Sequence, residues 1–360
     1  MNGISTGALP DYAVPTGDYI AEWMEDNGIN AAELARRMGV SRKHVSELLR
    51  GQAPLSREMA LRLERVTGVP ANNWNNLEAL YQEDQVRLAA QADLAAGYDA
   101  VAKFPLNYLR KWGFVTAPKT DRPGTVSQVL AFFRVGGIEA LTASWAGSAI
   151  AYRKTAASLP SREDLMTWLM VAEHLVSVDN LPPFDRDGFE SMVPKLRELT
   201  LGNPDTYVDE AVELLASAGV ALCLVPEVPK LKVYGATRWV QGHPLIQLSL
   251  RGKTDDQLWF TLFHEVGHVL KHPPTKLYMV GTSQKEEMEA DRFAADTLIP
   301  PEQATSMPRE RNLQAVRDFA EAVGVAPGIV IGRIQRETED YAWGNALKQR
   351  FEFCMPARQQ

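Results

Sequence analysis

Apolar residues recur at helical spacing in five short segments near the start of the chain, and single glycines separate the segments. Gly28, Gly39, Gly51 and Gly68 mark the breaks. Glycine is common at helix ends because it adopts the left-handed backbone conformation without strain. The pattern predicts five helices that pack into a compact bundle: residues 18–26, 30–38, 41–50, 56–66 and 72–81.

The middle of the chain is also predicted to be helical. An Ala-rich segment continues the last helix over residues 84–98 and would act as a rigid connector. Shorter helical stretches broken by Pro and Gly follow, and Ser161 begins a capping box that predicts a helix through Val176. The aromatic residues of this region are expected to pack in the core, which is a commoner use than a cofactor site.

The pattern changes to strands in the C-terminal half. Two helices are expected at residues 187–199 and 206–218. Residues 233–240 and 245–250 are predicted strands, and residues 241–244 (QGHP) predict the hairpin turn between them. A substrate backbone could add to the edge of such a hairpin, and a plain core sheet is the equal alternative.

A long helix is predicted directly after the hairpin. Leu258, Leu262, Val266 and Leu270 recur at helical period, and residues 254–257 (TDDQ) have the spacing of a capping box. A second capping box, SQKE, predicts a further helix rich in acidic residues after a short loop.

The long helix carries an H-E-x-x-H motif. His264 and His268 are one helical turn apart, so their imidazoles share a face and can chelate one metal ion. Glu265 lies beside them and can take a proton from a water molecule. A catalytic zinc site needs a third ligand that leaves the fourth position to water. Glu289 on the next helix is the predicted third ligand, and His272 is the weaker candidate because it lies further along the same helix axis.

The composition is that of an ordinary protein with a sizeable core. The 360 residues are 45% hydrophobic and 23% charged, enough for two or three domains. Two cysteines make neither a disulfide framework nor a Cys-rich zinc site. The start of the chain lacks a signal-peptide pattern, and no run of about eighteen apolar residues occurs. We therefore expect a cytoplasmic protein without membrane association.

The charge is unevenly distributed along the chain. The net charge is −7, yet residues 36–65 hold eight Arg or Lys against three Glu. A basic module in an acidic chain is typical of a DNA-binding domain, and a solvated charged face is the alternative. Ser41 is expected to cap the third helix, which follows the second through a Gly-Val-Ser turn typical of a helix-turn-helix. The predicted DNA-contacting residues lie on the polar face of that helix: Arg42, Lys43, His44, Ser46, Glu47 and Arg50.

Residues 15–88 resemble the HigA family of antitoxin repressors, within the Xre/Cro/cI helix-turn-helix group. The segments that carry the resemblance are 28–41 (GINAAELARRMGVS), 48–51 (LLRG), 59–63 (MALRL) and 73–81 (NWNNLEALY). The resemblance implies a homodimer that binds a double-stranded DNA operator, with a cognate toxin as one candidate partner.

From about residue 187 onward, the chain resembles the ImmA/IrrE family of zinc-dependent metallopeptidases. The resemblance rests on segments 242–246 (GHPLI), 260–268 (FTLFHEVGH), 289–295 (EADRFAA), 298–300 (LIP) and 326–333 (APGIVIGR). It implies zinc bound by His264, His268 and Glu289, with Glu265 as the catalytic base, and a protein as the substrate.

The sequence therefore predicts an α+β, mainly helical protein. The expected parts are a flexible arm (1–15), a five-helix DNA-binding bundle (16–83), a helical middle region (84–183), a zincin-like metallopeptidase domain with a small sheet and the H-E-x-x-H helix (184–345), and a tail (346–360).

The predicted function is a DNA-binding regulator whose peptidase domain cleaves a protein partner or repressor. The alternative is a non-catalytic HigA-like repressor whose C-terminal domain is a sensor or a toxin-binding surface. A hydrolase of non-peptide amides would use the same site. Three residues are open candidates for stabilising the oxyanion: His243, Tyr278 and Arg292.

Overall fold

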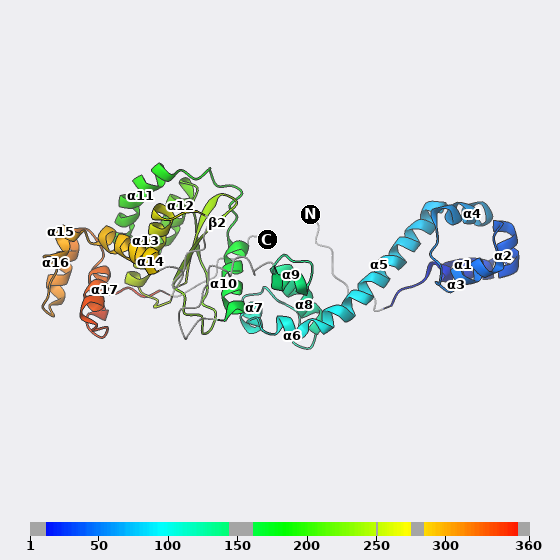
Figure 1. Cartoon of the computed structure of the whole chain (residues 1–360), viewed down its shortest axis with the longest axis horizontal. Helices are drawn as coiled ribbons and strands as arrows, with labels where there is room; N and C mark the ends of the chain where they lie inside the picture. The colour runs from blue at the N-terminus through cyan, green and yellow to red at the C-terminus, as the bar shows by residue number, and fades with distance from the viewer. Residues whose placement is uncertain (1–11, 144–160, 250, 275–283, 352–360) are drawn as a thin grey trace. The chain divides into compact units, whose positions relative to one another are not determined.

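The computed structural model describes residues 12–143, 161–249, 251–274 and 284–351 (Figure 1). It is mainly helical with one small sheet, so the predicted fold class is confirmed. Contacts divide the chain into two units, Met1–Asp99 with Ala117–Ser127, and Ala100–Thr116 with Gln128–Gln360. Within the described residues, no helix has both the length and the apolar character needed to cross a bilayer.

The first unit contains the predicted helix bundle. Its helices are α1 (Thr16–Asp26), α2 (Ala31–Met38), α3 (Arg42–Leu49), α4 (Arg57–Thr67) and α5 (Ala71–Ala96). Side chains of Asn30, Ser41 and Ser56 accept hydrogen bonds from backbone N–H groups in the first turns of α2, α3 and α4. The core of the bundle includes Ile20, Leu34, Val45, Leu48, Leu63 and Trp74.

The helix α5 runs without interruption for 26 residues. It combines the predicted fifth helix with the Ala-rich connector, and the predicted domain boundary at residue 83 lies inside it. Alanine, leucine and glutamine favour the helix, and no Pro or Gly interrupts the segment before Gly97.

The middle region is built from short helices. They are α6 (Tyr98–Val101), α7 (Leu106–Lys111), α8 (Arg122–Phe132), α9 (Ile138–Ala143) and the longer α10 (Arg162–Leu175). Ser161 caps α10 as predicted, because its Oγ accepts from the N–H of Asp164 at 3.1 Å. Phe132, Phe133 and Trp168 are buried, as expected for packing residues, whereas Trp145 lies outside the described residues.

The sheet of the described residues has three strands. They are β1 (Ala221–Leu224), β2 (Gly235–Val240) and β3 (His243–Leu248), in the order β1-β3-β2. β3 pairs in parallel with β1 and antiparallel with β2, so β2 forms one edge. The predicted four-residue turn is wrong: Val240 pairs with His243, and only Gln241 and Gly242 lie between the strands. Both have positive φ, 50° and 87°, which suits the two-residue turn of a tight hairpin.

The remaining helices surround the sheet and one another. They are α11 (Arg186–Glu198), α12 (Tyr207–Ser217), α13 (Asp255–Lys271), α14 (Gln284–Leu298), α15 (Pro301–Ala304), α16 (Leu313–Val323) and α17 (Pro327–Thr338), with the 3-10 turns η2 (Leu199–Leu201) and η3 (Asn345–Leu347). α13 contacts β2, β3, α14 and α17, and α10 contacts β1. The H-E-x-x-H helix is therefore the central element of the second unit.

The predicted helix after the hairpin is α13, and it is more deeply buried than its periodic apolar positions alone require. Trp259, Phe263, Val266 and the neighbouring residues are buried around its whole circumference. The predicted capping box is wrong, because the Thr254 side chain makes no capping bond. The second predicted box begins at Ser283, which lies outside the described residues.

Gly267 allows α13 and α14 to approach closely. A Cβ at this position would lie 3.2 Å from the Cα of Ala290 and 3.1 Å from the ring of Phe293. These distances are tighter than ordinary contacts, so a larger residue would push the helices apart. The close approach brings the side chains of α14 to the motif histidines.

The first turn of α13 contains a buried carboxyl group that links pH to stability. Asp255 is 2% exposed, and burial raises its pKa to about 6, against hydrogen bonds from the N–H groups of Gln349 and Asp256. The pKa of an Asp in an unfolded chain is about 4. Between about pH 4 and 6 the folded state therefore binds more protons at this position than the unfolded state does. Stability contributed by this group is therefore present at low pH and lost as the pH rises through about 6.

We predict that Asp255→Asn removes the loss of folding stability that accompanies ionisation of Asp255. At pH 7 the ionised Asp255 costs on the order of 2–3 kcal/mol, because one pKa unit corresponds to about 1.4 kcal/mol. Urea unfolding at several pH values from 4.5 to 7.5 should give a flatter profile for Asp255→Asn than for the wild type. The exposed Asp318→Asn is the control and should leave the wild-type slope unchanged. Parallel profiles for Asp255→Asn and the wild type would contradict the prediction.

Candidate metal centre and DNA-binding helix

Two imidazoles and one carboxylate converge between α13 and α14. The Nε2 atoms of His264 and His268 lie 3.1 Å apart. The carboxylate of Glu287 lies 3.4 Å from the Nε2 of His264 and 3.5 Å from that of His268. Three ligand atoms of these residues lie within 4.8 Å of one another. This is the one such group of His, Cys, Asp or Glu among the residues that the structure describes.

The donor set and its spacing fit a tetrahedral zinc ion. Zinc binds imidazole nitrogen and carboxylate oxygen at about 2.0–2.1 Å, which places tetrahedral ligand atoms about 3.3 Å from each other. The observed separations of 3.1, 3.4 and 3.5 Å are close to this value. Two histidines and one carboxylate also match the three-ligand composition of a catalytic rather than a structural site.

The structure brings Glu287, and not the predicted Glu289, to the two histidines. The Glu289 carboxylate instead lies 3.1 Å from the Nε2 of His272 and 3.7 Å from the Nζ of Lys285. Two positions along a helix correspond to a rotation of about 200°, so Glu287 and Glu289 point to different sides of α14. Glu287 shares its side with Asp291, which follows it by one turn.

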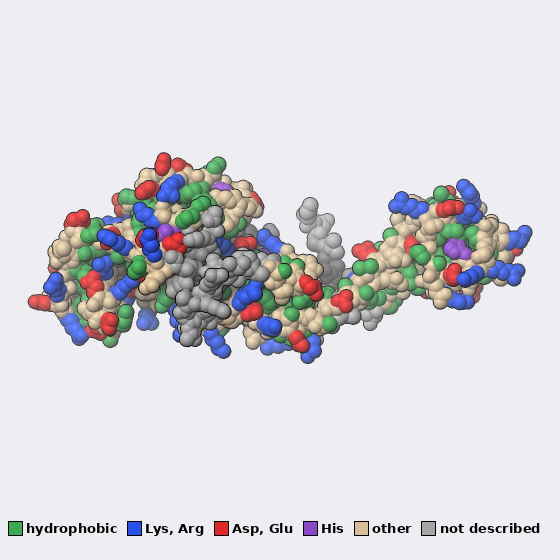
Figure 2. Space-filling view, in the orientation of Figure 1, with side chains coloured by type: hydrophobic (Ala, Val, Ile, Leu, Met, Phe, Trp, Pro, Cys, Tyr) green, Lys and Arg blue, Asp and Glu red, His purple; other side chains and the backbone are tan. Residues whose placement is uncertain are grey.

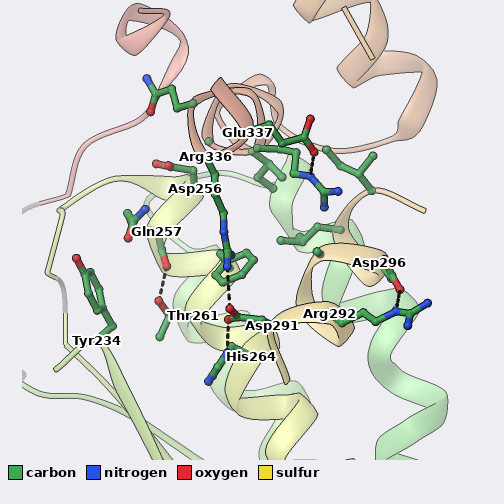
Figure 3. A pocket seen from close by; sticks show the side chains of 18 of the residues that line it. Tyr234, Asp256, Gln257, Thr261, His264, Asp291, Arg292, Asp296, Arg336 and Glu337 are labelled. Carbon is green, nitrogen blue, oxygen red and sulfur yellow. Dashed lines mark hydrogen bonds and ion pairs between the residues drawn. The ribbon is translucent and has the colours of Figure 1, made fainter. Parts of the chain in front are cut away.

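The outer nitrogen of His264 contacts a carboxylate that a cation holds in place. The Nδ1 of His264 lies 2.9 Å from Oδ1 of Asp291. The second oxygen of Asp291 accepts from Nη2 of Arg336 at 2.7 Å, and the guanidinium of Arg336 lies over the ring of Phe260 (Figure 3). Such outer partners select the tautomer of a metal-binding histidine and orient its ring.

His268 has a different outer partner. Its Nδ1 lies 2.9 Å from the Nδ1 of His272, whose Nε2 lies 3.1 Å from Oε2 of Glu289. One arrangement of protons satisfies both contacts: His268 donates from Nδ1, and His272 donates from Nε2 to the carboxylate. His268 then directs the lone pair of Nε2 toward Glu287 and His264. Glu289 is thus placed to support a ligand through His272.

The buried charges affect one another strongly. Burial would raise the pKa of Glu287, yet its contacts with the imidazoles of His264 and His268 lower it to about 2. Burial opposes protonation of His264, but Asp291 and Glu287 raise its pKa to about 10. Burial lowers the pKa of His268. The site therefore keeps Glu287 ionised, which is the form that binds a cation.

Glu265 is held by the edge strand β2. It is 2% exposed, and its Oε2 accepts from the hydroxyl of Thr237 at 2.7 Å. A Cβ at Gly235 would lie 2.4 Å from its other oxygen, so only glycine leaves room for the carboxylate. Burial raises the pKa of Glu265 to about 7, despite the nearby His264 and the Thr237 bond. A carboxyl group with a pKa near neutrality is suited to exchange protons at physiological pH.

A cavity of about 900 Å³ opens beside these groups. His264 and Glu265 line it, together with Tyr234 and Gly235 at the start of β2 and side chains from α14 and α17 (Figure 3). Its size is that of a ligand-binding pocket. Substrate atoms in the cavity would therefore contact the convergent site directly.

The predicted oxyanion candidates lie in different places. Nδ1 of His243 is 2.9 Å from the carbonyl oxygen of Gly219, at the hairpin turn. Arg292 lines the cavity, where its Nε pairs with Asp296 at 3.4 Å. Tyr278 lies outside the described residues.

The predicted DNA-reading helix α3 turns its polar face outward. Val45 and Leu48 are buried in the bundle, whereas Arg42, Lys43 and the C-cap residue Arg50 are exposed. His44, Ser46 and Glu47 are partly exposed on the same helix, and Glu47 pairs with Lys43 at 3.7 Å. Figure 2 shows many Lys and Arg side chains on the surface of this unit.

Some of the basic residues that suggested a DNA-binding module have structural contacts. Arg36 and Arg37 both donate to Glu33 and lower its pKa to about 2. Arg62 donates to the carbonyl oxygens of Met38 and Gly39 and so joins α4 to the end of α2. The exposed basic groups of α3 make no such links between elements of the described bundle, which leaves them available to phosphates.

Comparison with known proteins supports two domains. Residues 20–73 match the helix-turn-helix family, and residues 227–335 match the IrrE N-terminal-like domain. A stretch of 62 residues is 37% identical to the uncharacterized HTH-type transcriptional regulator YddM of Escherichia coli (strain K12), covering 17% of this chain and 66% of that protein. A stretch of 70 residues is 31% identical to virulence-associated protein I of Dichelobacter nodosus, covering 19% of this chain and 65% of the relative.

The chain therefore joins an Xre-type helix-turn-helix domain at its N-terminus to an IrrE/ImmA-like peptidase domain at its C-terminus. The matches confirm the resemblance to the Xre-type helix-turn-helix group and the resemblance to IrrE/ImmA-like peptidases. The chain spans about two thirds of the length of the two relatives, and each relative covers less than a fifth of this chain.

We predict that Glu287 and Glu289 of α14 differ in their effect on metal binding. Glu287→Gln should weaken zinc binding by about 100-fold or more, because it removes a direct ligand, whereas Glu289→Gln should weaken it by about tenfold through His272. Zinc affinity is measured by competition with a chromophoric chelator, and circular dichroism checks the fold. A larger loss of zinc affinity in Glu289→Gln than in Glu287→Gln would indicate that Glu289 is the third ligand.

Proposed function

We propose that this protein is a DNA-binding transcriptional regulator whose C-terminal domain is a zinc-dependent endopeptidase that cleaves a protein partner or repressor. The observation that supports the peptidase most directly is the convergence of His264, His268 and Glu287 beside a buried glutamate with a pKa of about 7. A structural metal site would not need that additional carboxyl group next to an open cavity.

The protein groups would divide the reaction between them. A zinc ion held by the two histidines and Glu287 would supply Lewis-acid polarisation of the substrate carbonyl. Glu265 would remove a proton from the attacking water and deliver it to the leaving amine. Thr237 holds one oxygen of Glu265 at 2.7 Å, and so fixes the direction in which the other oxygen points. Asp291 and His272 orient the two imidazoles.

The edge strand suggests how a peptide would be held. β2 pairs with β3 on one side and lies at the edge of the described sheet. Its first residue, Gly235, lines the cavity and its third, Thr237, contacts Glu265. An extended peptide that added to this edge would place its backbone next to the catalytic carboxylate. This placement favours a peptide over a compact small-molecule amide.

The N-terminal domain supports operator binding. We propose that α3 enters the major groove, with Arg42, Lys43 and Arg50 at phosphates and base edges. We further propose a cytoplasmic homodimer of the HigA type that binds an inverted repeat, with a cognate toxin as a candidate partner. Cleavage of a bound partner would then change transcription.

We predict that Glu265→Gln abolishes proteolysis and retains zinc and DNA binding. The amide keeps the shape of the carboxylate but cannot accept the proton, so the rate should fall at least about 100-fold. Wild-type and Glu265→Gln proteins are each co-expressed with the neighbouring genes, and mass spectrometry identifies any cut specific to the wild type. Zinc per chain is measured in both. A wild-type protein that binds DNA and cleaves nothing would favour the non-catalytic antitoxin repressor.

We predict that Arg42→Ala combined with Lys43→Ala weakens binding to the DNA upstream of the protein's own gene by about tenfold. Loss of two phosphate contacts should also reduce the slope of log affinity against log salt by about 2. Fluorescence anisotropy with that DNA and with a scrambled duplex measures both effects. Lys230→Ala with Lys232→Ala removes the same charge from exposed positions of the other unit and is the matched control. If both double variants have the same DNA affinity and the same salt dependence, the DNA contact does not involve these residues of α3.

A further inference from the structure

We infer that the cavity beside the metal centre receives a bulky apolar side chain of the substrate, so that the enzyme selects its cleavage site by a hydrophobic residue next to the scissile bond. This inference rests on the proposed peptidase function. It specifies the class of residue that the site accepts and the classes that it rejects.

Part of the cavity lining is apolar. It comprises Phe260 of α13, Leu298 at the end of α14, Ile299 directly after it, and Ile329 of α17. Leu298, Ile299 and Ile329 are each less than 5% exposed, so they form a fixed wall that belongs to the hydrophobic core. An apolar side chain that entered would be removed from water against this wall, and burial of its apolar surface would favour binding.

The cations that line the cavity are all paired with acids that line the same cavity. Arg336 pairs with Asp291 at 2.7 Å, and Lys348 pairs with Asp256 at 2.7 Å. The other two pairs are Arg292 with Asp296 at 3.4 Å and Arg333 with Glu337 at 2.5 Å (Figure 3).

These pairs weaken the cavity as a binding site for charge. An acidic substrate side chain would have to compete with an existing carboxylate for each cation, and it would lose its own hydration on entry. A basic side chain faces the same difficulty, because each acid of these four pairs is already neutralised. A charge on the substrate side chain therefore disfavours binding in the cavity, whereas burial of an apolar side chain favours it.

The position of the cavity links this selection to cleavage. Its volume of about 900 Å³ leaves room for a bulky side chain. His264 and Glu265 line the same cavity as Phe260. Gly235, the first residue of the edge strand β2, lines it as well. A peptide held along β2 would therefore place the side chain adjacent to the scissile bond in the cavity.

The test profiles cleavage without a known substrate. Zinc-loaded full-length protein is incubated with a proteome-derived peptide library, and mass spectrometry identifies the residues flanking each cut. Leu, Ile, Met, Phe and Tyr should be enriched at one flanking position at least about tenfold over Asp, Glu and Lys. The variant Ala295→Trp adds a large side chain to the cavity lining and should shift that preference to Gly, Ala and Ser.

Two further variants serve as a control and as a second test of the cavity. Leu201→Trp introduces the same residue at an exposed site that does not line the cavity and should leave the profile unchanged. Phe260→Ala enlarges the cavity and should extend the preference toward Trp, which keeps the test informative if Ala295→Trp does not fold. An unchanged profile in both cavity variants, or a preference for charged residues, overturns the inference and leaves the peptidase function intact.

A binding measurement separates the inference from the proposed function. Zinc-loaded Glu265→Gln protein is titrated with fluorescein-labelled hexapeptides that carry Leu, Phe, Asp, Lys or Gly at one position. Binding of the Leu and Phe peptides at least about tenfold tighter than the Asp, Lys and Gly peptides supports the cavity assignment, even if the wild type cleaves nothing and the peptidase proposal fails. Equal binding, or no binding, overturns the assignment.

Discussion

The burial of ionisable groups inside the core helix α13 is the constraint on which the second unit depends. His264, Glu265 and His268 are all less than 10% exposed, and Glu287 lies against the two histidines from α14. Unpaired charges cannot remain in such a place at acceptable free energy. The structure meets this demand by giving each group a partner: Asp291 from α14 for His264, Thr237 from β2 for Glu265, and His272 at the C-terminal cap of α13 for His268. A metal ion would satisfy the three inner atoms in the same way.

These partners make the site a product of packing between elements. Asp291 depends on Arg336 of α17, and Glu265 fits only because Gly235 of β2 has no side chain. Gly267 sets the distance at which α14 crosses α13. A change in the position of any of these elements would alter the orientation of a proposed metal ligand or of the proposed base. The cavity lies among the same helices, so the proposed specificity and the proposed chemistry depend on one scaffold.

Much of the fold followed from local patterns, and the exceptions have physical causes. The bundle helices and the caps at Ser41 and Ser161 were predictable, because capping depends on residues within one turn. The hairpin turn was predicted too long, because QGHP was treated as a loop although Gln241 and Gly242 suffice to reverse the chain. The prediction of Glu289 as the third ligand did not take the phase of α14 into account. The buried positions Ala290, Ala294 and Leu298 mark its inner side, and Glu287 and Asp291 flank that side.

The sequence by itself determined the helix-turn-helix, the pair of imidazoles one turn apart and the neighbouring Glu265, because each depends on spacing within a single helix. Only the tertiary structure decided which carboxylate of α14 meets the histidines, which partners hold them, and what lines the cavity. Apart from the contact of His268 with His272, these contacts join residues on different elements, and their geometry depends on how closely the helices approach and how they are rotated. The spacing of residues along one helix contains no such information.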